Sequence, residues 1–350
     1  MMAALVAHKP AWLLTRSDAP MIAVSSRVRL ARNLAALPFP LRATVKQREL
    51  VIEQVQAAAR AVPELADAHL LMLQTLSALD RQFLVERHLA SPEFAAQDGP
   101  AALLVTPDQS FALMIIEEDH LRLQALAPGL ALAQTWDVLD RLDSALEQHL
   151  AYAYSARYGY LTACPTNVGT GLRASVMVHL PALVQQRKIG AVISAVGKVG
   201  IAVRGLYGEQ SDARGSLFQI SNQITLGRAE GDIIQQLTHL ISRVIEHETT
   251  LRDALRKNEP HQLRNAVGRA YGTLRYAEIL KSDEATDLLS TLLMGIDLHV
   301  FETVERSCIA ELLIDIQPAH LQKFYGRELS SEQRDLMRAT LVRERLQSHA

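Results

Sequence analysis

The stretch Gly159–Pro181, GYLTACPTNVGTGLRASVMVHLP, restricts what this chain can become more than any other segment. It places Cys164, which precedes a proline, shortly before the closely spaced Gly169 and Gly171. Glycine lets the backbone approach a bound group closely and adopt positive φ angles. The spacing predicts a ligand-binding turn followed by a helix from near Leu172, whose free N–H groups would face an anion such as phosphate.

The charge around this turn has a single sign. The sequence contains no Asp or Glu between Glu147 and Glu209. The same interval contains the cations Arg157, Arg173, Arg187, Lys188, Lys198 and Arg204. A segment of this kind creates a positive field. Because the net charge of the whole chain is only -2, we predict a pocket for a compact polyanion rather than a nucleic-acid-binding surface.

The composition is that of a soluble globular protein, since 49% of the 350 residues are hydrophobic and 21% are charged. The N-terminus does not have the pattern of a secretory signal, and no apolar run reaches the length of a membrane span. Cys164 and Cys308 lie far apart without metal-ligand spacing, so we predict neither a disulfide framework nor a protein-bound metal site. We expect a cytoplasmic protein without nucleic-acid or membrane partners.

The apolar periodicity predicts an α+β chain with two domains. Alternation predicts strands over Ile22–Leu30, a hairpin over 101–126 and further antiparallel strands over 189–227. Helical spacing predicts helices over 44–61, 79–89, 133–158 and 172–188, and only helices after Gly231. We place the boundary near residue 255, so that a mixed-sheet domain (1–255) precedes a helical domain (256–350).

The charged residues at strand ends and loops favour phosphoryl transfer. They comprise the arginines Arg27, Arg29, Arg122, Arg173 and Arg204, the carboxylates Glu118 and Glu209, and Cys164. Guanidinium groups bind phosphate oxygens with two parallel hydrogen bonds, and phosphoryl transfer needs mainly positioning and charge neutralisation. An arginine clamp with magnesium fits that need, and the carboxylates would face a cationic acceptor.

From the spacing alone, purely structural interpretations of the same residues also stay open. Arg27 and Arg29 are also compatible with a solvated strand edge, and Glu118 with a simple salt bridge to Arg122. The string GTGLRA matches a dinucleotide-binding pattern. It follows Cys-Pro-Thr-Asn instead of an apolar strand, and no acidic residue lies about twenty positions further on to hold a ribose.

Several motifs together resemble the ATP:guanidino phosphotransferases, and in detail the bacterial protein-arginine kinases of the McsB family. These motifs are SSRVRLARN, EEDHLRLQ, CPTNVGTGLRASV, RGLYGE and RNAVGRAYGTLRYAEIL. The resemblance implies an antiparallel-sheet catalytic domain with surrounding helices, followed by a helical C-terminal domain. Creatine and free-arginine kinases carry a helical domain before the catalytic one, whereas here the first motif starts at Ser25, which we expect to leave no room for it.

The resemblance also implies roles for single residues. Glu118 would orient and deprotonate the substrate guanidinium, Glu209 would hold its other side, and Cys164 would lie close to it as a thiolate. Residues expected at ATP are Arg27, Val28, Arg29, Leu30, Ala31, His88, Arg122, Arg173, Ala174, Ser175, Val176, Met177, Arg204, Gly205, Leu206, Tyr207 and Gly208. The chain departs from the usual family pattern at Ile116, where relatives carry asparagine, and at Ala163, where they carry serine.

A second motif, RDLMRA, matches the phosphoarginine-binding element of the family, which has an allosteric role. Arg334 and Arg338 are one helical turn apart and share a face, which suits a doubly charged phosphoryl group. With Asp335 and Ala339 they form the expected phosphoarginine site. Taken alone, this pattern is also typical of a solvated helix face.

The resemblance therefore predicts a kinase that uses ATP and Mg²⁺ to phosphorylate arginine side chains of proteins. It implies a role in marking proteins for a Clp-type unfoldase and protease, a zinc-binding activator protein and a homodimer. A kinase for free arginine or another small guanidine is the first alternative. A catalytically silent phosphoarginine reader is the second.

Overall fold

The computed structural model describes residues 2–13, 22–205 and 213–348. The chain divides into two compact units. The first consists of Met1–Trp12, Ser25–Val176 and Ser221–Thr238, and the second of Leu13–Val24, Met177–Ile220 and His239–Ala350. Each unit is described by itself below.

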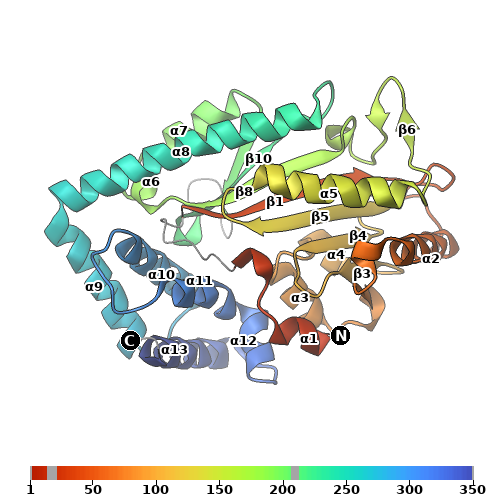
Figure 1. The fold of residues 1–350 in the computed structure, drawn as a ribbon. Helices are drawn as coiled ribbons and strands as arrows, with labels where there is room; N and C mark the ends of the chain where they lie inside the picture. Colours follow the sequence, from red (N-terminus) through yellow and green to blue (C-terminus); the bar gives the residue numbers. More distant parts are fainter. Residues whose placement is uncertain (1, 14–21, 206–212, 349–350) are drawn as a thin grey trace. The chain divides into compact units, whose positions relative to one another are not determined.

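An eight-stranded sheet has the strand order β2-β3-β4-β5-β1-β8-β10-β9 (Figure 1). Its strands are β1 (Ala23–Arg32), β2 (His69–Met72), β3 (Ala102–Val105), β4 (Phe111–Ile115), β5 (Leu121–Pro128), β8 (Leu172–His179), β9 (Ile201–Gly205) and β10 (Leu217–Asn222). A separate two-stranded hairpin joins β6 (Tyr154–Ser155) to β7 (Gly159–Tyr160). The α+β fold class is confirmed, as is the strand near residue 22. The hairpin predicted over 101–126 corresponds to β3 and β4, but β5 adds a third strand that the prediction did not include.

The register of β1 against β5 decides where the arginines lie. The two strands are antiparallel, with Arg29 opposite Gln124 and Ala31 opposite Arg122. Directly opposed residues in a sheet face the same side, and so do residues two apart on one strand. Arg27, Arg29 and Arg122 therefore project from one face of the sheet.

Two helices of the first unit begin at capping boxes. The helices of this unit are α1 (Met2–Ala7), α2 (Val45–Ala61), α3 (Ala78–Glu86), α4 (Pro92–Ala96), α5 (Leu132–Glu147) and the part of α8 (Glu230–Asn258) up to Thr238. Thr44 and Gln47 form a capping box at α2, and Ser77 and Asp80 form one at α3. Both helices are confirmed, whereas the helix predicted to run to residue 158 already ends at Glu147.

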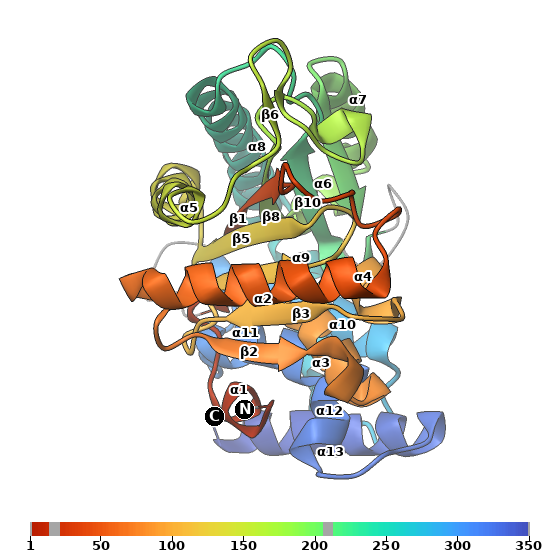
Figure 2. The same cartoon turned by 90° about the vertical axis from the view of Figure 1, so that its right-hand side faces the viewer.

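Two of these helices cover strands of the first unit. Helix α5 packs against β5 and lies across that strand in Figure 1. Helix α2 packs against β4 and crosses the view in Figure 2. Both bury an apolar stripe, which includes Val51 and Val55 of α2 and Leu139 and Leu146 of α5.

The prediction of a helix from Leu172 is wrong, because Leu172–His179 forms strand β8. Leu172, Ala174, Val176 and Val178 are all fully buried, which is the two-residue period of a strand. The helix that follows, α6 (Pro181–Gln185), starts only at the proline. The segment that directly follows the glycine turn therefore supplies strand backbone and not the predicted helix N-terminus.

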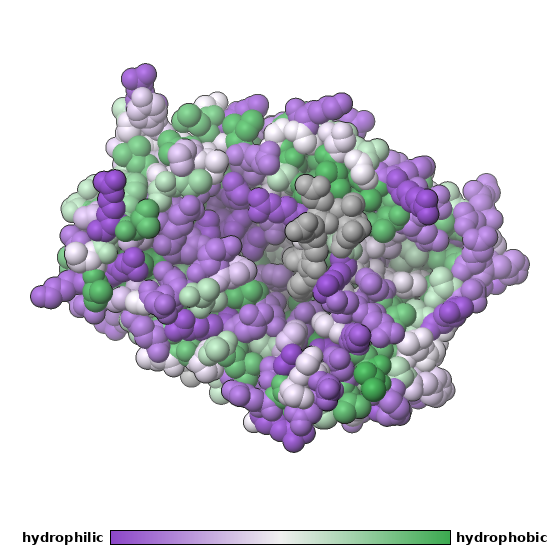
Figure 3. Space-filling model, turned by 180° about the vertical axis from the view of Figure 1, so that it is seen from behind, coloured by the Kyte–Doolittle hydropathy of each residue, from purple (hydrophilic) through white to green (hydrophobic). Residues whose placement is uncertain are grey.

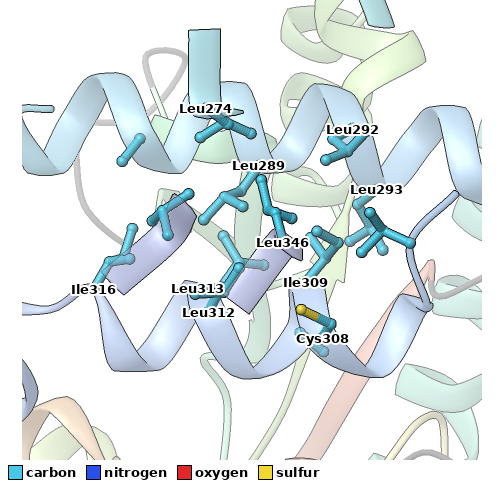
Figure 4. Close-up of a cluster of buried hydrophobic side chains, with 14 of the residues drawn as sticks. Leu274, Leu289, Leu292, Leu293, Cys308, Ile309, Leu312, Leu313, Ile316 and Leu346 are labelled. Carbon is cyan, nitrogen blue, oxygen red and sulfur yellow. The ribbon is translucent and has the colours of Figure 1, made fainter. Parts of the chain in front are cut away.

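The second unit is mainly helical. Its helices are α6, α7 (Ile189–Gly197), the part of α8 (Glu230–Asn258) from His239 onward, α9 (Pro260–Tyr276), α10 (Ser282–Asp297), α11 (Arg306–Asp315), α12 (Pro318–Phe324) and α13 (Ser331–Ser348). The strand predicted to begin at residue 189 is wrong, because residues 189–197 form helix α7. Leucines of α10 interdigitate with Ile309, Leu312 and Leu313 of α11 to form the core drawn in Figure 4.

A buried ionic network ties this unit together. The Arg252 side chain is 2% exposed and donates to Glu248 Oε1 (2.8 Å) and Asp297 Oδ2 (2.9 Å). Glu248 accepts hydrogen bonds from the backbone N–H groups of Ala182 and Leu183, which satisfies the first turn of α6. Arg252 also donates to the ring nitrogen Nδ1 of His179 (3.2 Å).

None of the described helices combines the length and the apolar character needed to cross a membrane. On the face drawn in Figure 3, hydrophilic and hydrophobic residues are interspersed.

Candidate active site

Four arginines of the first unit converge on one face of the sheet. Arg27 and Arg29 come from β1, Arg122 from β5 and Arg173 from the second residue of β8. Burial and the charge of Arg122 lower the pKa of Arg27 to about 10. Burial holds the pKa of Arg29 well below its usual value, and the charges of Arg27, Arg122 and Arg173 depress it further. These guanidinium groups are close enough to repel one another, so an anion between them would relieve the repulsion.

One donor in this arginine cluster lacks an acceptor. The Nε atom of Arg29 is buried and has no hydrogen-bond partner among the described residues. Buried donors are nearly always paired in native proteins, and an unpaired one marks a place where a ligand oxygen fits. Planar guanidinium groups match phosphate oxygens in geometry and charge. The arginine cluster therefore suits a polyphosphate.

The acidic loop after β4 contributes two carboxylates with different surroundings. Glu117 forms a short ion pair with Arg122 and accepts a hydrogen bond from Ser91 Oγ (2.8 Å). Glu118 is 46% exposed, and its nearest carboxylate oxygen lies 3.9 Å from Arg122 Nη2. The main partner of Arg122 is thus Glu117 and not Glu118, which the spacing had suggested. Glu118 stays accessible to another cation.

Partial burial raises the pKa of the Glu118 carboxyl, and the charge of Asp119 raises it further, whereas Arg122 and Arg173 act in the opposite direction. A carboxylate with a raised pKa is a stronger proton acceptor than an ordinary glutamate. Because Glu118 lies 3.9 Å from Arg122, it borders the arginine cluster.

Asp119 fastens the acidic loop to two other segments. Its Oδ1 atom accepts hydrogen bonds from Asn33 Nδ2 (2.6 Å) and from the backbone N–H of Ala163 (2.6 Å). Asn33 follows β1 directly, and Ala163 precedes Cys164. Asp119 therefore links the acidic loop to the segment that directly precedes Cys164. Asp119 and Asn33 both lie inside the motifs EEDHLRLQ and SSRVRLARN, but the spacing of these motifs did not predict the hydrogen bond between the two side chains.

Ile116 adopts a left-handed backbone conformation with φ 62°, and it is completely buried. This region is unfavourable for a β-branched residue, whereas asparagine tolerates it. Isoleucine at this position, directly before the acidic loop, therefore costs conformational free energy that asparagine would largely avoid.

The turn that contains Cys164 is held by backbone contacts. Cys164 is half-buried, and its Sγ atom lies 3.0 Å from Thr166 Oγ1. Gly169 has φ 108°, and a Cβ atom there would lie 2.7 Å from the carbonyl oxygen of Thr225. Gly171 has φ 65°, and a Cβ atom there would lie 2.6 Å from the carbonyl oxygen of Ala31. Both positions require glycine, because the backbone has a positive φ there and packs directly against the carbonyl groups of Thr225 and Ala31.

The remaining residues expected at ATP have mixed surroundings. Val28, Leu30, Ala31, Ala174, Ser175 and Val176 are buried, so they contribute strand backbone. His88 has φ 59°, and its ring lies 5.3 Å from that of Trp12. Met177, Arg204 and Gly205 belong to the second unit, where Arg204 is exposed at the end of β9. Leu206, Tyr207, Gly208 and Glu209 lie outside the described residues.

The RDLMRA motif lies on α13 of the second unit. Arg338 is 1% exposed and donates to the carbonyl oxygens of Ile316 (2.9 Å) and Leu280 (2.8 Å) and to Asp335 (2.6 Å). Arg334 and Asp335 are half-buried, and Ala339 is buried. Of the two arginines, Arg334 is therefore the one with an accessible side chain.

Two family models match the chain. The model for the C-terminal catalytic domain of ATP:guanido phosphotransferases matches residues 50–251, and the model for the C-terminal domain of protein-arginine kinase McsB matches residues 260–350. The protein-arginine kinase of Moorella thermoacetica is 47% identical over 328 residues, which cover 93% of this chain and 94% of the relative. That of Desulforamulus reducens is 45% identical over 340 residues, which cover 96% and 95%.

The chain belongs to the protein-arginine kinase family.

Solved structures of guanidino kinases share the fold of this protein-arginine kinase family member. The chain resembles lombricine kinase with a TM-score of 0.60 at 24% identity, covering 73% of this chain and 72% of that one. It also resembles the duplicated taurocyamine kinase of Schistosoma mansoni bound to transition-state analogue components, with a TM-score of 0.60 at 25% identity, covering 70% of this chain and 35% of that one. The guanidino-kinase fold predicted from the motifs is thus confirmed.

Proposed function

We propose that this protein transfers the γ-phosphoryl group of ATP to arginine side chains of proteins, and that it does so at the arginine cluster of β1, β5 and β8. Membership of the protein-arginine kinase family supports the reaction. The observation that supports the location is the convergence of Arg27, Arg29, Arg122 and Arg173, with the unpaired Nε atom of Arg29 among them.

In this proposal the arginine cluster binds and neutralises the phosphates of ATP. Positive groups fixed in advance stabilise the charge that develops during phosphoryl transfer without having to reorient. His88 and residues 174–176 of the first unit would lie near the nucleotide. For Met177 and for Arg204 to Gly208, contact with ATP stays a prediction from the family motifs. Mg²⁺ would enter with ATP, bound to phosphate oxygens that the arginines leave free.

Glu118 is the proposed proton acceptor. A guanidinium group with a pKa above about 12 cannot attack phosphorus while it is fully protonated. Glu118 would take a proton from the terminal nitrogen of the substrate arginine as that nitrogen forms the N–P bond. The bond between the γ-phosphorus and its bridging oxygen breaks at the same time, and ADP leaves with the electron pair. Glu209 lies outside the described residues, and its role in holding the other side of the substrate group stays a prediction, as does the role of Cys164 near that group.

Phosphorus NMR tests this reaction directly. The purified protein is incubated with ATP, Mg²⁺ and an arginine-rich unfolded protein, and the expected product shows an acid-labile phosphoramidate signal. A phosphoester signal would contradict the proposal. Product formed only with free arginine would favour a small-molecule guanidino kinase, and binding of phosphoarginine without any turnover would favour a silent reader.

The proposed setting of this reaction is protein quality control in the cytoplasm. Phosphorylated proteins would pass to a Clp-type unfoldase and protease, a zinc-binding protein would act as activator, and the kinase would work as a homodimer. Arg334 and Asp335 are the half-buried charged residues of the RDLMRA motif and would bind phosphoarginine. Co-purification of the chain with such partners, and its mass in solution, test these points separately.

A further inference from the structure

Arg32 is a fifth arginine of the first unit near the active site, but it does not belong to the arginine cluster. It is the last residue of β1 and an even-numbered one, so it projects from the opposite face to Arg27 and Arg29. It is 2% exposed. Burying a guanidinium group costs free energy unless acceptors pair with its N–H donors. The acceptors of Arg32 therefore indicate which segments this side chain holds together.

The partners of Arg32 come from segments far apart in the sequence. Its Nε and Nη2 atoms donate to Asp143 Oδ2 on α5, at 3.0 and 2.6 Å. Its Nη1 atom donates to the carbonyl oxygens of Ala31 (3.0 Å) and Thr170 (2.9 Å). The ring of Tyr160 covers the guanidinium, with the Cζ atom 3.5 Å from the ring centroid. The ion pair and the ring fix the guanidinium on one side, and the Thr170 carbonyl is held on the other.

The Thr170 carbonyl belongs to the turn that leads into β8. The next residue, Gly171, accepts a hydrogen bond at its carbonyl oxygen from the N–H of Ala31 (3.0 Å). A Cβ atom on Gly171 would lie 2.7 Å from Arg32 Nη1. The turn therefore fits closely against the end of β1 and the guanidinium. Arg173 follows two residues later on β8.

We propose that Arg32 is a positioning residue for phosphoryl transfer, which fixes Arg173 against Arg27 and Arg29 by holding the carbonyl of Thr170. This inference rests on the proposed role of Arg173 at the phosphates of ATP. A displacement of about 1 Å in a phosphate-binding group can lower catalytic efficiency about 100-fold, even when the altered residue lies away from the chemistry. Arg32 would thus set the geometry of a site that it does not touch.

Arg252 provides a matched control in the second unit. It is equally buried, at 2% exposure, and it also donates to carboxylates and to a backbone carbonyl oxygen. Substitution of either arginine by lysine keeps the charge but removes the planar, forked set of donors. The lysine in Arg32→Lys can reach Asp143 or the Thr170 carbonyl, but it cannot bridge both as the guanidinium does.

The experiment compares Arg32→Lys, Asp143→Asn, Arg252→Lys and Arg173→Lys with the unaltered protein. Each is assayed at a temperature at which circular dichroism shows it folded, for kcat, for KM of ATP and for the dissociation constant of ATP. We expect Arg32→Lys to raise KM for ATP and to lower kcat/KM about 10- to 100-fold. Asp143→Asn should act in the same direction with a smaller effect, and Arg252→Lys should keep kcat/KM within about 3-fold of the parent.

The outcomes separate this inference from the proposed function. If Arg173→Lys impairs ATP binding while folded Arg32→Lys and Asp143→Asn keep the parent kcat/KM, the positioning role is wrong and the phosphate site stands. Equal losses in Arg32→Lys and Arg252→Lys would show a general effect of buried ion pairs and would also overturn the inference. If Arg173→Lys binds ATP as tightly as the parent, the proposed phosphate site itself is wrong.

Discussion

Glu117 forms the short ion pair with Arg122, and the neighbouring Glu118 is left half-exposed 3.9 Å from the same guanidinium. Two adjacent carboxylates of one loop therefore have different tasks. In the proposed reaction, Glu117 orients an arginine that would bind the phosphates, whereas Glu118 would accept a substrate cation. The motifs had singled out Glu118, but the pairing of Glu117 with Arg122 could not be seen from the sequence, where both carboxylates are part of the same acidic run.

This division predicts different kinetic defects for the two carboxylates. Glu118→Gln should lower kcat about 10²- to 10⁴-fold, which is the usual contribution of a general base, and leave the dissociation constant of ATP nearly unchanged. Glu117→Gln should instead raise KM for ATP, because Arg122 loses the partner that orients it. Initial rates and calorimetric ATP binding measure both, with the exposed Glu93→Gln as a control. Equal kcat losses in the two variants would contradict the assignment.

The buried His179 predicts that stability falls in mild acid. Burial and the charge of Arg252 hold the pKa of His179 well below its usual value. The unfolded chain therefore binds a proton that the folded chain does not, and stability is lost as pH falls below the unfolded pKa of about 6.5. The loss amounts to about 1.4 kcal/mol per pH unit in that window.

The measurement is the free energy of unfolding in urea at pH 7.5 and 5.5, for the parent and for His179→Gln. Glutamine does not titrate, so the variant should lose less stability than the parent between the two pH values. Identical losses would mean that His179 is protonated in the folded state.

Strain at Ile116 predicts an unusual tolerance to asparagine. At Ile115, which is fully buried in β4, asparagine should cost about 3 kcal/mol or more through lost apolar burial and an amide without partners. At Ile116, with φ 62°, relief of the left-handed strain should return about 1 to 2 kcal/mol of this. Urea unfolding of Ile115→Asn and Ile116→Asn tests the difference. A cost at 116 as large as at 115 would refute the strain argument.

Close packing at Gly295 predicts opposite effects of alanine at two helix positions. A Cβ atom at Gly295 on α10 would lie 2.6 Å from Val267 Cγ1 on α9, so Gly295→Ala should destabilise the protein by about 1 to 3 kcal/mol. Gly268 on α9 has no atom within 4 Å of such a Cβ, and Gly268→Ala should stabilise by about 0.5 to 1 kcal/mol. Thermal unfolding of both variants gives the comparison. Stabilisation at position 295 would show that α9 and α10 separate easily.

The RDLMRA motif predicts a separation between binding and stability. Arg338→Ala should lower the free energy of unfolding by about 3 kcal/mol, because it leaves Asp335 and two buried carbonyl groups without their donor. Arg334→Ala should leave stability within about 0.5 kcal/mol of the parent and weaken binding of a phosphoarginine peptide. Fluorescence anisotropy of a labelled peptide and urea unfolding measure the two effects. Unchanged peptide affinity in Arg334→Ala would remove this residue from the proposed site.

The sequence by itself determined the parts that local chemistry controls. Apolar spacing predicted the helix over 44–61, which is α2, because residues three and four apart share one face of a helix. Alternation marked β1 and put Arg27 and Arg29 on a common face, because side chains repeat every two residues along a strand. The motifs around them were specific enough to give the family and the fold.

Only the tertiary structure decided the pairings between distant segments. Leu172–His179 was predicted as a helix, and the tertiary structure made it strand β8, with Leu172, Ala174, Val176 and Val178 fully buried along one face. Arg32 and Thr170 are 138 positions apart, and Arg338 is 58 positions from Leu280. Such contacts depend on the free energy of burying particular donors against particular acceptors once the whole chain has packed, and no local pattern encodes that free energy.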